Sequence, residues 1–319
     1  DIIEKEEKSR YLDWYFIDEL PPKSAGGEIP NFKCFGYYGG MPKLNLKNPE
    51  VEKYITDVAC YWIKECDIDG WRLDVGDEIS HFFWKNFRKA IKAVKKDMLI
   101  IGEIWHYAGD FLEGDEWDTV MNYPFYLNLI DLLADEKINV SQFVQNLGYL
   151  KGRLNKKCYP LMWNLIDSHD TARFLHLCHD NKKKQHLAAA FQLLLPGMPM
   201  IYYGDEFAMP GANDPDCRRG MYWDEEYQDK EMFEWYKQLL KVRKNHACIV
   251  EGEPLEIAAR DGEETIVLTR KNDEETLALI FNCSSSARMF NEYKQKYDLL
   301  RENPFDGKIE GLDAAVIVL

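Results

Sequence analysis

The sequence predicts an α/β protein with a largely parallel sheet, followed by a small antiparallel β domain. Short apolar strands alternate with amphipathic helical segments through the middle of the 319-residue chain, which is the pattern of βαβ units. From about Glu251 onward, alternating apolar and polar residues are separated by Asp-Gly and Asn-Asp turns, as in antiparallel strands. The length allows one domain of roughly 200–250 residues and a second, smaller one.

Composition argues against several classes of protein. The chain has 40 Lys and Arg against 55 Asp and Glu, a formal net charge of -15, and no basic block that would suit a nucleic acid. No apolar run approaches the roughly 18 residues of a membrane span. An aromatic content of 13% argues against disorder. The eight cysteines are scattered without a CxxC pair, so we expect reduced thiols in a cytoplasmic protein.

Residues 1–48 are predicted to form an irregular loop region. Aromatic residues stand between its prolines and glycines, which include Gly26 and Gly27, so the loop either packs on a neighbouring element or lines a cleft. The first residues have no signal-peptide character, and the chain begins with Asp1 rather than Met. We therefore expect that a preceding part of the protein has been removed.

Residues 49–250 are predicted to hold the alternating helices and strands. Asn48 is a candidate N-cap for an amphipathic helix, because apolar residues from Val51 to Ile63 repeat at helical spacing. A second helix is expected at about 80–96. The residues expected on its buried face are Phe83, Phe87, Ile91 and Val94.

The expected strands distinguish between α/β architectures. They lie at 68–75, 98–104, 119–122, 162–167 and 198–203. An eight-unit barrel takes about 250 residues, whereas these units occupy far fewer, so the count favours an open doubly wound sheet or an incomplete barrel. Residues 251–319 are expected to form the C-terminal β domain, with strands at 265–270, 276–282 and 314–319.

Charged residues recur where the expected strands end. Arg72 and Asp74 are two positions apart, hence on one face of a strand, and the guanidinium favours the ionised carboxylate. Glu103 ends the next strand. Because neighbouring strands lie about 4.8 Å apart, the two carboxylates are expected near the roughly 5–5.5 Å separation of a retaining glycosidase. We expect apolar surroundings to raise the pKa of Glu103 toward that of a general acid.

A third carboxylate, Asp170, follows His169 at a later strand end. Each residue alone has a structural alternative: Arg72 and Asp74 as an ion pair, Glu103 as an acid at a helix N-terminus, His169 as a core histidine, and Asp170 as a cap for a helix beginning at Thr171. Together, their position at carboxyl ends of strands favours an active site.

Longer motifs around these residues resemble the α-amylase family, in its neopullulanase and cyclomaltodextrinase branch. The similarity extends from about residue 10 to the terminal β domain. The matching segments are Asp69-Gly70-Trp71-Arg72-Leu73-Asp74, Gly102-Glu103-Ile104-Trp105-His106, Ser168-His169-Asp170, Met41-Pro42-Lys43-Leu44-Asn45, Tyr202-Tyr203-Gly204-Asp205-Glu206 and Asn213-Asp214-Pro215-Asp216-Cys217-Arg218.

The resemblance implies a (β/α)₈ barrel, of which this chain holds only the C-terminal five βα units, followed by a C-terminal β-sandwich. It also implies retaining cleavage of α-1,4-glucans by double displacement. Asp74 would be the nucleophile, Glu103 the acid/base, and Asp170 the group that holds the sugar 2- and 3-hydroxyls. The residues implied in substrate binding are Arg72, His169, Trp105, His106, Tyr123, Asp214 and Arg218; for the last two, a weak surface ion pair is the alternative.

Two departures from the family pattern stand out. Val75-Gly76-Asp77-Glu78 replaces the usual Val-Ala-Asn-Glu, and the Asp-x-x-x-Asn-His region that should follow the third barrel strand does not occur in the chain. We expect either that the chain is a fragment of a longer enzyme, which we favour, or that another chain supplies the missing strands. The N-terminal domain with which this branch commonly dimerises does not occur in the chain either. Whether the protein forms a homo-oligomer stays open.

Three functions remain open on the sequence alone. They are a cytoplasmic hydrolase of maltodextrins or cyclodextrins, a transglycosylase using the same site, and a catalytically incomplete chain that only binds glucan. The expected partner is an α-glucan oligosaccharide, with no nucleic acid and no membrane. We expect no cofactor and no metal; calcium occurs in the wider family, but the sequence has no cluster of Asp and Asn at ligand spacing.

Overall fold

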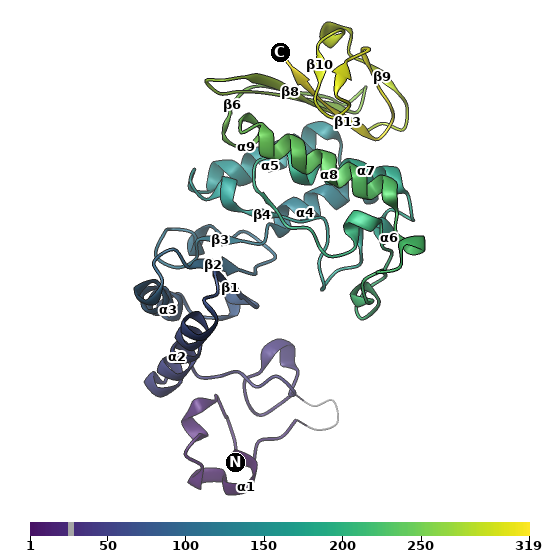
Figure 1. Cartoon of the computed structure of the whole chain (residues 1–319). Coiled ribbons are helices and arrows are strands. Elements are labelled where there is room, and N and C mark those ends of the chain that lie inside the picture. The colour runs from purple at the N-terminus through teal and green to yellow at the C-terminus, as the bar shows by residue number, and fades with distance from the viewer. Residues whose placement is uncertain (25–28) are drawn as a thin grey trace. The chain divides into compact units, whose positions relative to one another are not determined.

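A computed structural model describes residues 1–24 and 29–319, so Gly26 and Gly27 of the predicted loop lie outside the described residues (Figure 1). The chain forms two compact units, which are described one at a time. The first comprises Asp1–Glu103 with Glu113–Asp118, and the second Ile104–Leu112 with Thr119–Leu319.

The first unit begins with the predicted loop region, which contains only short elements. Isolated bridges join Tyr15 to Leu44 and Cys34 to Pro42. The Trp14 indole donates to Glu50 Oε2 at 3.2 Å, so the loop packs on the helix that follows it. The short elements are α1 (Ile2–Lys5), η1 (Glu6–Lys8), η2 (Leu12–Trp14) and η3 (Phe35–Tyr37).

Two helices follow, as predicted, and both have a side-chain cap at the N-terminus. In α2 (Pro49–Cys66) the Asn48 side chain accepts from the N–H of Glu50. In α3 (His81–Val94) the Ser80 hydroxyl accepts from Phe83. Both bonds satisfy N–H groups that have no partner within the helix. The prediction that Val94 lies on the buried face is wrong: Val94 is exposed at the last turn, and Trp84 is buried instead.

Each helix is followed by a strand, and the two strands, β1 (Gly70–Leu73) and β2 (Leu99–Gly102), pair in parallel. They are shorter than predicted, and each ends one residue before a carboxylate, Asp74 or Glu103. Their register pairs Leu73 with Gly102, so the residues that follow, Asp74 and Glu103, emerge at the same edge. A Cβ at Gly102 would lie 2.2 Å from the Trp117 side chain, so only glycine fits there.

The second unit continues the alternation of short parallel strands and helices. Strands β4 (Trp163–Asn164) and β5 (Met198–Pro199) pair in parallel, and Met121, next to β3 (Thr119–Val120), bridges to Trp163. Helix α7 is largely buried and contributes many residues to the hydrophobic core of the second unit. The helices are α4 (Tyr123–Leu129), which continues as the π-helix η6 (Ile130–Ala134), α5 (Val140–Arg153), α6 (Phe174–Leu177), α7 (Lys182–Leu194), α8 (Lys230–Asn245) and α9 (Cys248–Glu251).

The C-terminal part of this unit is an antiparallel sheet in the order β11-β10-β13-β8-β7-β6. The three strands predicted from the sequence are present as β7, β8 and β13. The edge strand β6 escaped prediction because its side chains are mostly exposed and do not alternate. The strands are β6 (Glu253–Arg260), β7 (Thr265–Lys271), β8 (Thr276–Asn282), β10 (Tyr297–Asp298), β11 (Asn303–Pro304) and β13 (Asp313–Val318), with β9 (Arg288–Met289) and β12 (Lys308–Ile309) paired separately.

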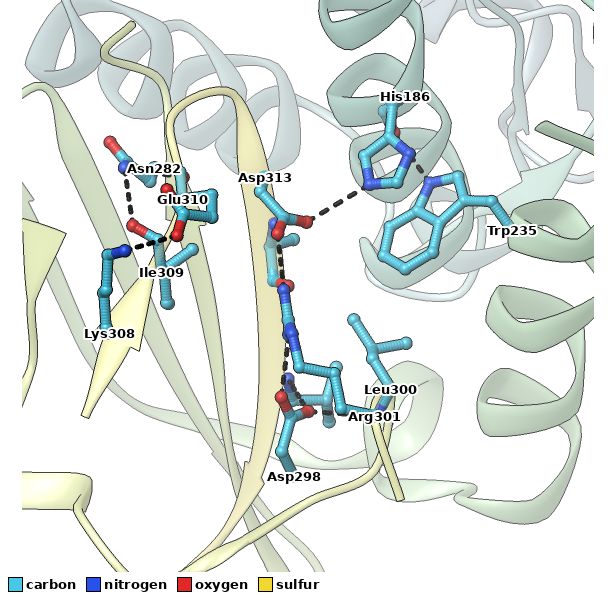
Figure 2. A network of polar contacts seen from close by, with 12 residues as sticks. His186, Trp235, Asn282, Asp298, Leu300, Arg301, Lys308, Ile309, Glu310 and Asp313 are labelled. Carbon is cyan, nitrogen blue, oxygen red and sulfur yellow. Dashed lines mark hydrogen bonds and ion pairs between the residues drawn. The ribbon is translucent and has the colours of Figure 1, made fainter. Parts of the chain in front are cut away.

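The sheet packs on α7 through stacked rings and a polar network. Phe191 of α7 stacks on Phe281 of β8 with ring centroids 4.2 Å apart. His186 of α7 contacts Asp313 of β13 at 3.2 Å, and Asp313 also binds Arg301 at 2.5 Å (Figure 2). Helices and C-terminal sheet therefore share one core within the second unit.

No helix in the described part of the chain is both long enough and apolar enough to cross a membrane. All eight cysteines lie in described residues and are free thiols. Several are deeply buried; for Cys178, burial raises the pKa of the thiol to about 12.

Candidate active site

In the first unit, Arg72 joins the two predicted catalytic carboxylates. Its Nη1 pairs with Asp74 Oδ1, and its Nη2 lies 2.5 Å from Glu103 Oε1. The parallel register of β1 and β2 brings the carboxylates to one guanidinium, because each residue directly follows a strand end. The Asp74 side chain is 77% exposed and that of Glu103 only 3%. Asp74 is therefore the one of the two that is open to a ligand.

The expectation that apolar groups surround Glu103 is wrong. Besides the Arg72 guanidinium, the backbone N–H of Val75 donates to Glu103 Oε2 at 3.0 Å. Val75 occupies a left-handed conformation with φ of 44°, which turns its N–H toward the carboxylate at the start of η4 (Gly76–Glu78). A tight turn after β1 thus supplies a polar pocket that the residue types alone did not reveal.

In the second unit, four predicted residues form one charged cluster around Asp170. His169 Nε2 lies 3.1 Å from Asp170 Oδ2, and Arg218 Nη2 lies 3.0 Å from Asp170 Oδ1. Arg218 Nε also binds Asp214 at 2.7 Å. The alternative of a simple surface ion pair between Asp214 and Arg218 is therefore incomplete, because Arg218 also binds Asp170.

The alternative that Asp170 caps a helix at Thr171 is wrong. The next helix, α6, begins at Phe174, whose N–H donates to Asp167 at 2.7 Å. The backbone between them is held by a turn in which Thr171 Oγ1 accepts from Ser168 at 2.9 Å. The Asp170 carboxylate is thus left to its two side-chain partners, His169 and Arg218.

Trp105 and Tyr123 are brought together, but only one of them faces outward. Their rings stack with centroids 4.2 Å apart and planes 12° apart. Trp105 is 42% exposed, whereas Tyr123 is 0% exposed and its hydroxyl lies 3.1 Å from Ser168 Oγ. Tyr123 cannot line a sugar cleft directly, so we reassign it to the support of Trp105. His106 is exposed beside Trp105, with Nδ1 3.3 Å from the carbonyl of Tyr107.

Sequence reasoning missed a buried charge cluster directly behind Asp170. Arg173 is 0% exposed, and its Nη1 lies 3.1 Å from Asp205 Oδ1. Asp167 and Asp205 are each 1% exposed. The ring of Tyr202 lies 4.4 Å below the Arg173 guanidinium, and Arg173 Nε donates to the carbonyl of Cys217. One cation therefore serves two buried carboxylates and the segment that presents Arg218.

The buried pair Asp167 and Asp205 retains one proton, because Arg173 is the one cation beside them that the described residues supply. Burial raises the pKa of Asp167 to about 6. Burial, and then repulsion by Asp167, raise the pKa of Asp205 well above its usual value. Asp205 therefore carries the proton and donates it to Asp167, since like charges this close cannot both ionise. The adjacent Tyr236 hydroxyl stays neutral, because burial raises its pKa far above the usual value.

This shared proton makes stability depend on pH. Above the ordinary Asp pKa of about 3.9, the folded state binds more protons than the unfolded state. The free energy of unfolding therefore falls as pH rises through 6 and beyond, by about 1.4 kcal/mol per pH unit for each proton that only the folded state holds. In Asp205→Asn the amide donates to Asp167 without titrating. We expect a flatter dependence of urea unfolding between pH 5 and 8 than in wild type or in the exposed control Asp273→Asn. Equal slopes in all three would refute the shared proton.

Within the residues that the structure describes, no group of three or more His, Cys, Asp or Glu could hold a metal ion. Arg72 pairs with Asp74 and Glu103, and Arg218 pairs with Asp170 and Asp214.

Parallel α/β units with charged clusters after their strands, followed by an antiparallel sheet, define the class: the chain belongs to the α-amylase family. Residues 4–228 match the family described as "Alpha amylase, catalytic domain", which implies a TIM-barrel type of fold. The resemblance found in the sequence motifs is thereby confirmed.

Two of the relatives are named cyclomaltodextrinase and neopullulanase. The chain is 43% identical over 287 residues to a cyclomaltodextrinase of Geobacillus thermopakistaniensis, covering 90% of this chain and 48% of that one. It is 44% identical over 253 residues to neopullulanase 2 of Thermoactinomyces vulgaris, covering 79% and 43% respectively. The chain thus spans about half the length of the curated relatives it matches.

Solved structures agree with this placement. A cyclomaltodextrinase structure matches with a TM-score of 0.93 and 34% identity over 99% of this chain and 57% of that one. A cyclic α-maltosyl-(1→6)-maltose hydrolase from Arthrobacter globiformis, in complex with cyclic α-maltosyl-(1→6)-maltose, matches with a TM-score of 0.88 and 30% identity over 100% of this chain and 71% of that one.

Proposed function

We propose that this protein hydrolyses α-1,4-glucosidic bonds of maltodextrins or cyclodextrins with retention of configuration. The single observation that carries the proposal is the Arg72 guanidinium, which contacts both Asp74 and Glu103 at the ends of adjacent parallel strands. Retaining glycosidases need two carboxyl groups close together, one as nucleophile and one as acid and base. The names of the relatives favour α-glucans as the substrate class.

Each carboxylate has a distinct role in this proposal. Asp74 attacks the anomeric carbon and forms an ester with the sugar, while Glu103 gives a proton to the departing glycosidic oxygen. Glu103 then takes a proton from water, whose oxygen attacks the same carbon and releases Asp74. The exposure of Asp74 and the burial of Glu103 support this order of roles. Arg72 holds both side chains in place.

Residues of the second unit bind the sugar in this proposal. Asp170 holds the 2- and 3-hydroxyls, and His169 and Arg218 fix its orientation through the contacts described above. Asp214 binds Arg218 and lies on the non-reducing side of the substrate. The exposed face of Trp105 offers an aromatic platform for a sugar ring, beside His106.

The finer architecture belongs to the same proposal. We infer that β1 to β5 correspond to the last five strands of a (β/α)₈ barrel, with an insertion at 1–48, barrel elements at 49–250 and a β-sandwich at 251–319. The start of β6 at Glu253, directly after α9, supports the second boundary. A relative in Bacillus subtilis is named intracellular maltogenic amylase, which supports a cytoplasmic location. The proposed reaction needs no cofactor.

The test is release of glucose and maltose from maltotriose and γ-cyclodextrin by the purified 319-residue chain. We expect cleavage by the wild-type chain and a loss of about 10²- to 10⁴-fold in Glu103→Gln, because the amide cannot transfer a proton. Glu113→Gln, an exposed glutamate of the same unit, is the matched control and should keep full activity. Equal cleavage by both variants, or none by a folded wild-type chain, would contradict the proposal.

A further inference from the structure

Strand β6 lies at one edge of the C-terminal sheet and pairs with β7 on one side (Figure 1). In the part of the chain that the structure describes, no strand pairs with its outer side. An edge strand presents a row of backbone N–H and C=O groups on that side. Two large apolar side chains of β6 are exposed as well, Leu255 at 59% and Ile257 at 52%. The strand therefore offers both backbone groups and apolar surface to a partner.

Features that keep edge strands from pairing are confined to the beginning of β6. Pro254 has no N–H to donate. The register with β7 shifts between Pro254 and Glu256, which leaves Leu255 in a bulge. From Glu256 to Arg260 the register with β7 is regular. Residues 256–260 are therefore the part of the edge to which a further strand can be added.

The charges of this segment complement those of a second copy in antiparallel orientation. Glu256 and Arg260 lie on the same face of β6, with Ala258 between them, because side chains alternate along a strand. When Ala258 lies opposite Ala258 of a second copy, each Glu256 lies opposite Arg260 of the other strand. Shifting the register by two positions places Glu256 opposite Ala258 or Gly262 instead, and both ion pairs are lost. One register is thus favoured by charge.

Both charged side chains are available for such pairs. Within the residues that the structure describes, Glu256 forms no ion pair and is exposed. Arg260 lies 3.4 Å from Glu263, and its side chain is 47% exposed. An exposed pair of this kind contributes little to stability, so Arg260 can exchange it for Glu256 of a second copy.

We propose that the outer edge of β6 binds a second copy of this chain, which adds its own β6 in antiparallel orientation and joins the two C-terminal sheets. Two Glu256–Arg260 pairs fix the register, and backbone hydrogen bonds of residues 256–260 supply the attraction. The contact is small, so the dimer is weak and its fraction depends on protein concentration. Because β6 contributes no residue to the proposed active site, this association is independent of the proposed function.

Sedimentation velocity of the full chain at about 1 to 100 μM tests the proposal. We expect a dimer whose fraction rises with concentration. Glu256→Arg and Arg260→Glu each place like charges opposite one another, so each should raise the Kd of the dimer about tenfold or more. Glu274→Arg makes the same change of charge at an exposed position of the turn between β7 and β8, and this matched control should leave the Kd unchanged.

Mixing the two variants provides the sharper measurement. Glu256→Arg carries only positive charges at positions 256 and 260, and Arg260→Glu carries only negative ones. An equimolar mixture should therefore form a heterodimer with a Kd close to that of the wild-type dimer, which a loss of folding in either variant would not produce. Circular dichroism checks that each variant is folded.

Three results would overturn the proposal. The first is a wild-type chain that stays monomeric at every concentration, because a second copy would then not be the occupant of the edge. The second is a dimer with the same Kd in wild type and both variants, which would place the contact on another surface. The third is a mixture of folded variants that associates no better than either variant alone.

Discussion

Arg173→Met is expected to lower the free energy of unfolding by about 3–5 kcal/mol at neutral pH, because it leaves the negative charge of the buried Asp167–Asp205 pair without its cation. Arg173 is 0% exposed, so water cannot take the place of the guanidinium next to Asp205. Methionine fills much of the same volume, which isolates the loss of charge from a cavity. The measurement is the midpoint of urea unfolding.

The matched control for this prediction is Arg219→Met. Arg219 binds Asp216 at 2.7 Å, but its side chain is 44% exposed, so the change should cost less than about 1 kcal/mol. The cost of Arg173→Met should also shrink at pH 5, where a second proton neutralises the buried pair. A similar, small cost for both variants would show that the buried cluster is not held together by Arg173.

Sequence reasoning succeeded where local pattern decides the structure. The Asn48 cap, the strand after α2 and the Arg72–Asp74 pair each depend on residues within a few positions of one another. The antiparallel C-terminal sheet was likewise evident from alternation and turns. The placement of Glu103 next to Asp74 followed because parallel neighbours end at one edge.

It failed where a partner comes from a distant part of the chain. Asp205 lies 32 positions from Arg173, and nothing in its own segment indicates that Asp167 shares its proton. The family resemblance implied that Tyr123 lines the cleft, but Tyr123 is buried, stacked on Trp105 and in contact with Ser168. Only the fold reveals such burial; the one available signal was that Asp167 directly precedes Ser168-His169-Asp170.

Asp74→Asn is expected to lower the rate of glucan cleavage by about 10⁴- to 10⁶-fold, the scale on which removal of a nucleophile acts. An amide is a poor nucleophile and cannot carry the negative charge that Arg72 pairs with in the wild-type chain. The fold should persist, because the Asp74 side chain is 77% exposed and forms no part of a core. Circular dichroism and the midpoint of urea unfolding, measured alongside the rate, check that the fold persists.

The most direct measurement of the central claim is the mass of the Glu103→Gln chain after incubation with α-maltosyl fluoride. Fluoride departs without an acid, whereas release of the sugar from Asp74 needs the missing base, so the intermediate accumulates. We predict a mass gain of one maltosyl group, mapped by peptide sequencing to Asp74. The double variant Asp74→Asn, Glu103→Gln should gain none. An unlabelled Glu103→Gln chain, or a label on another residue, would contradict the assignment of Asp74 as nucleophile.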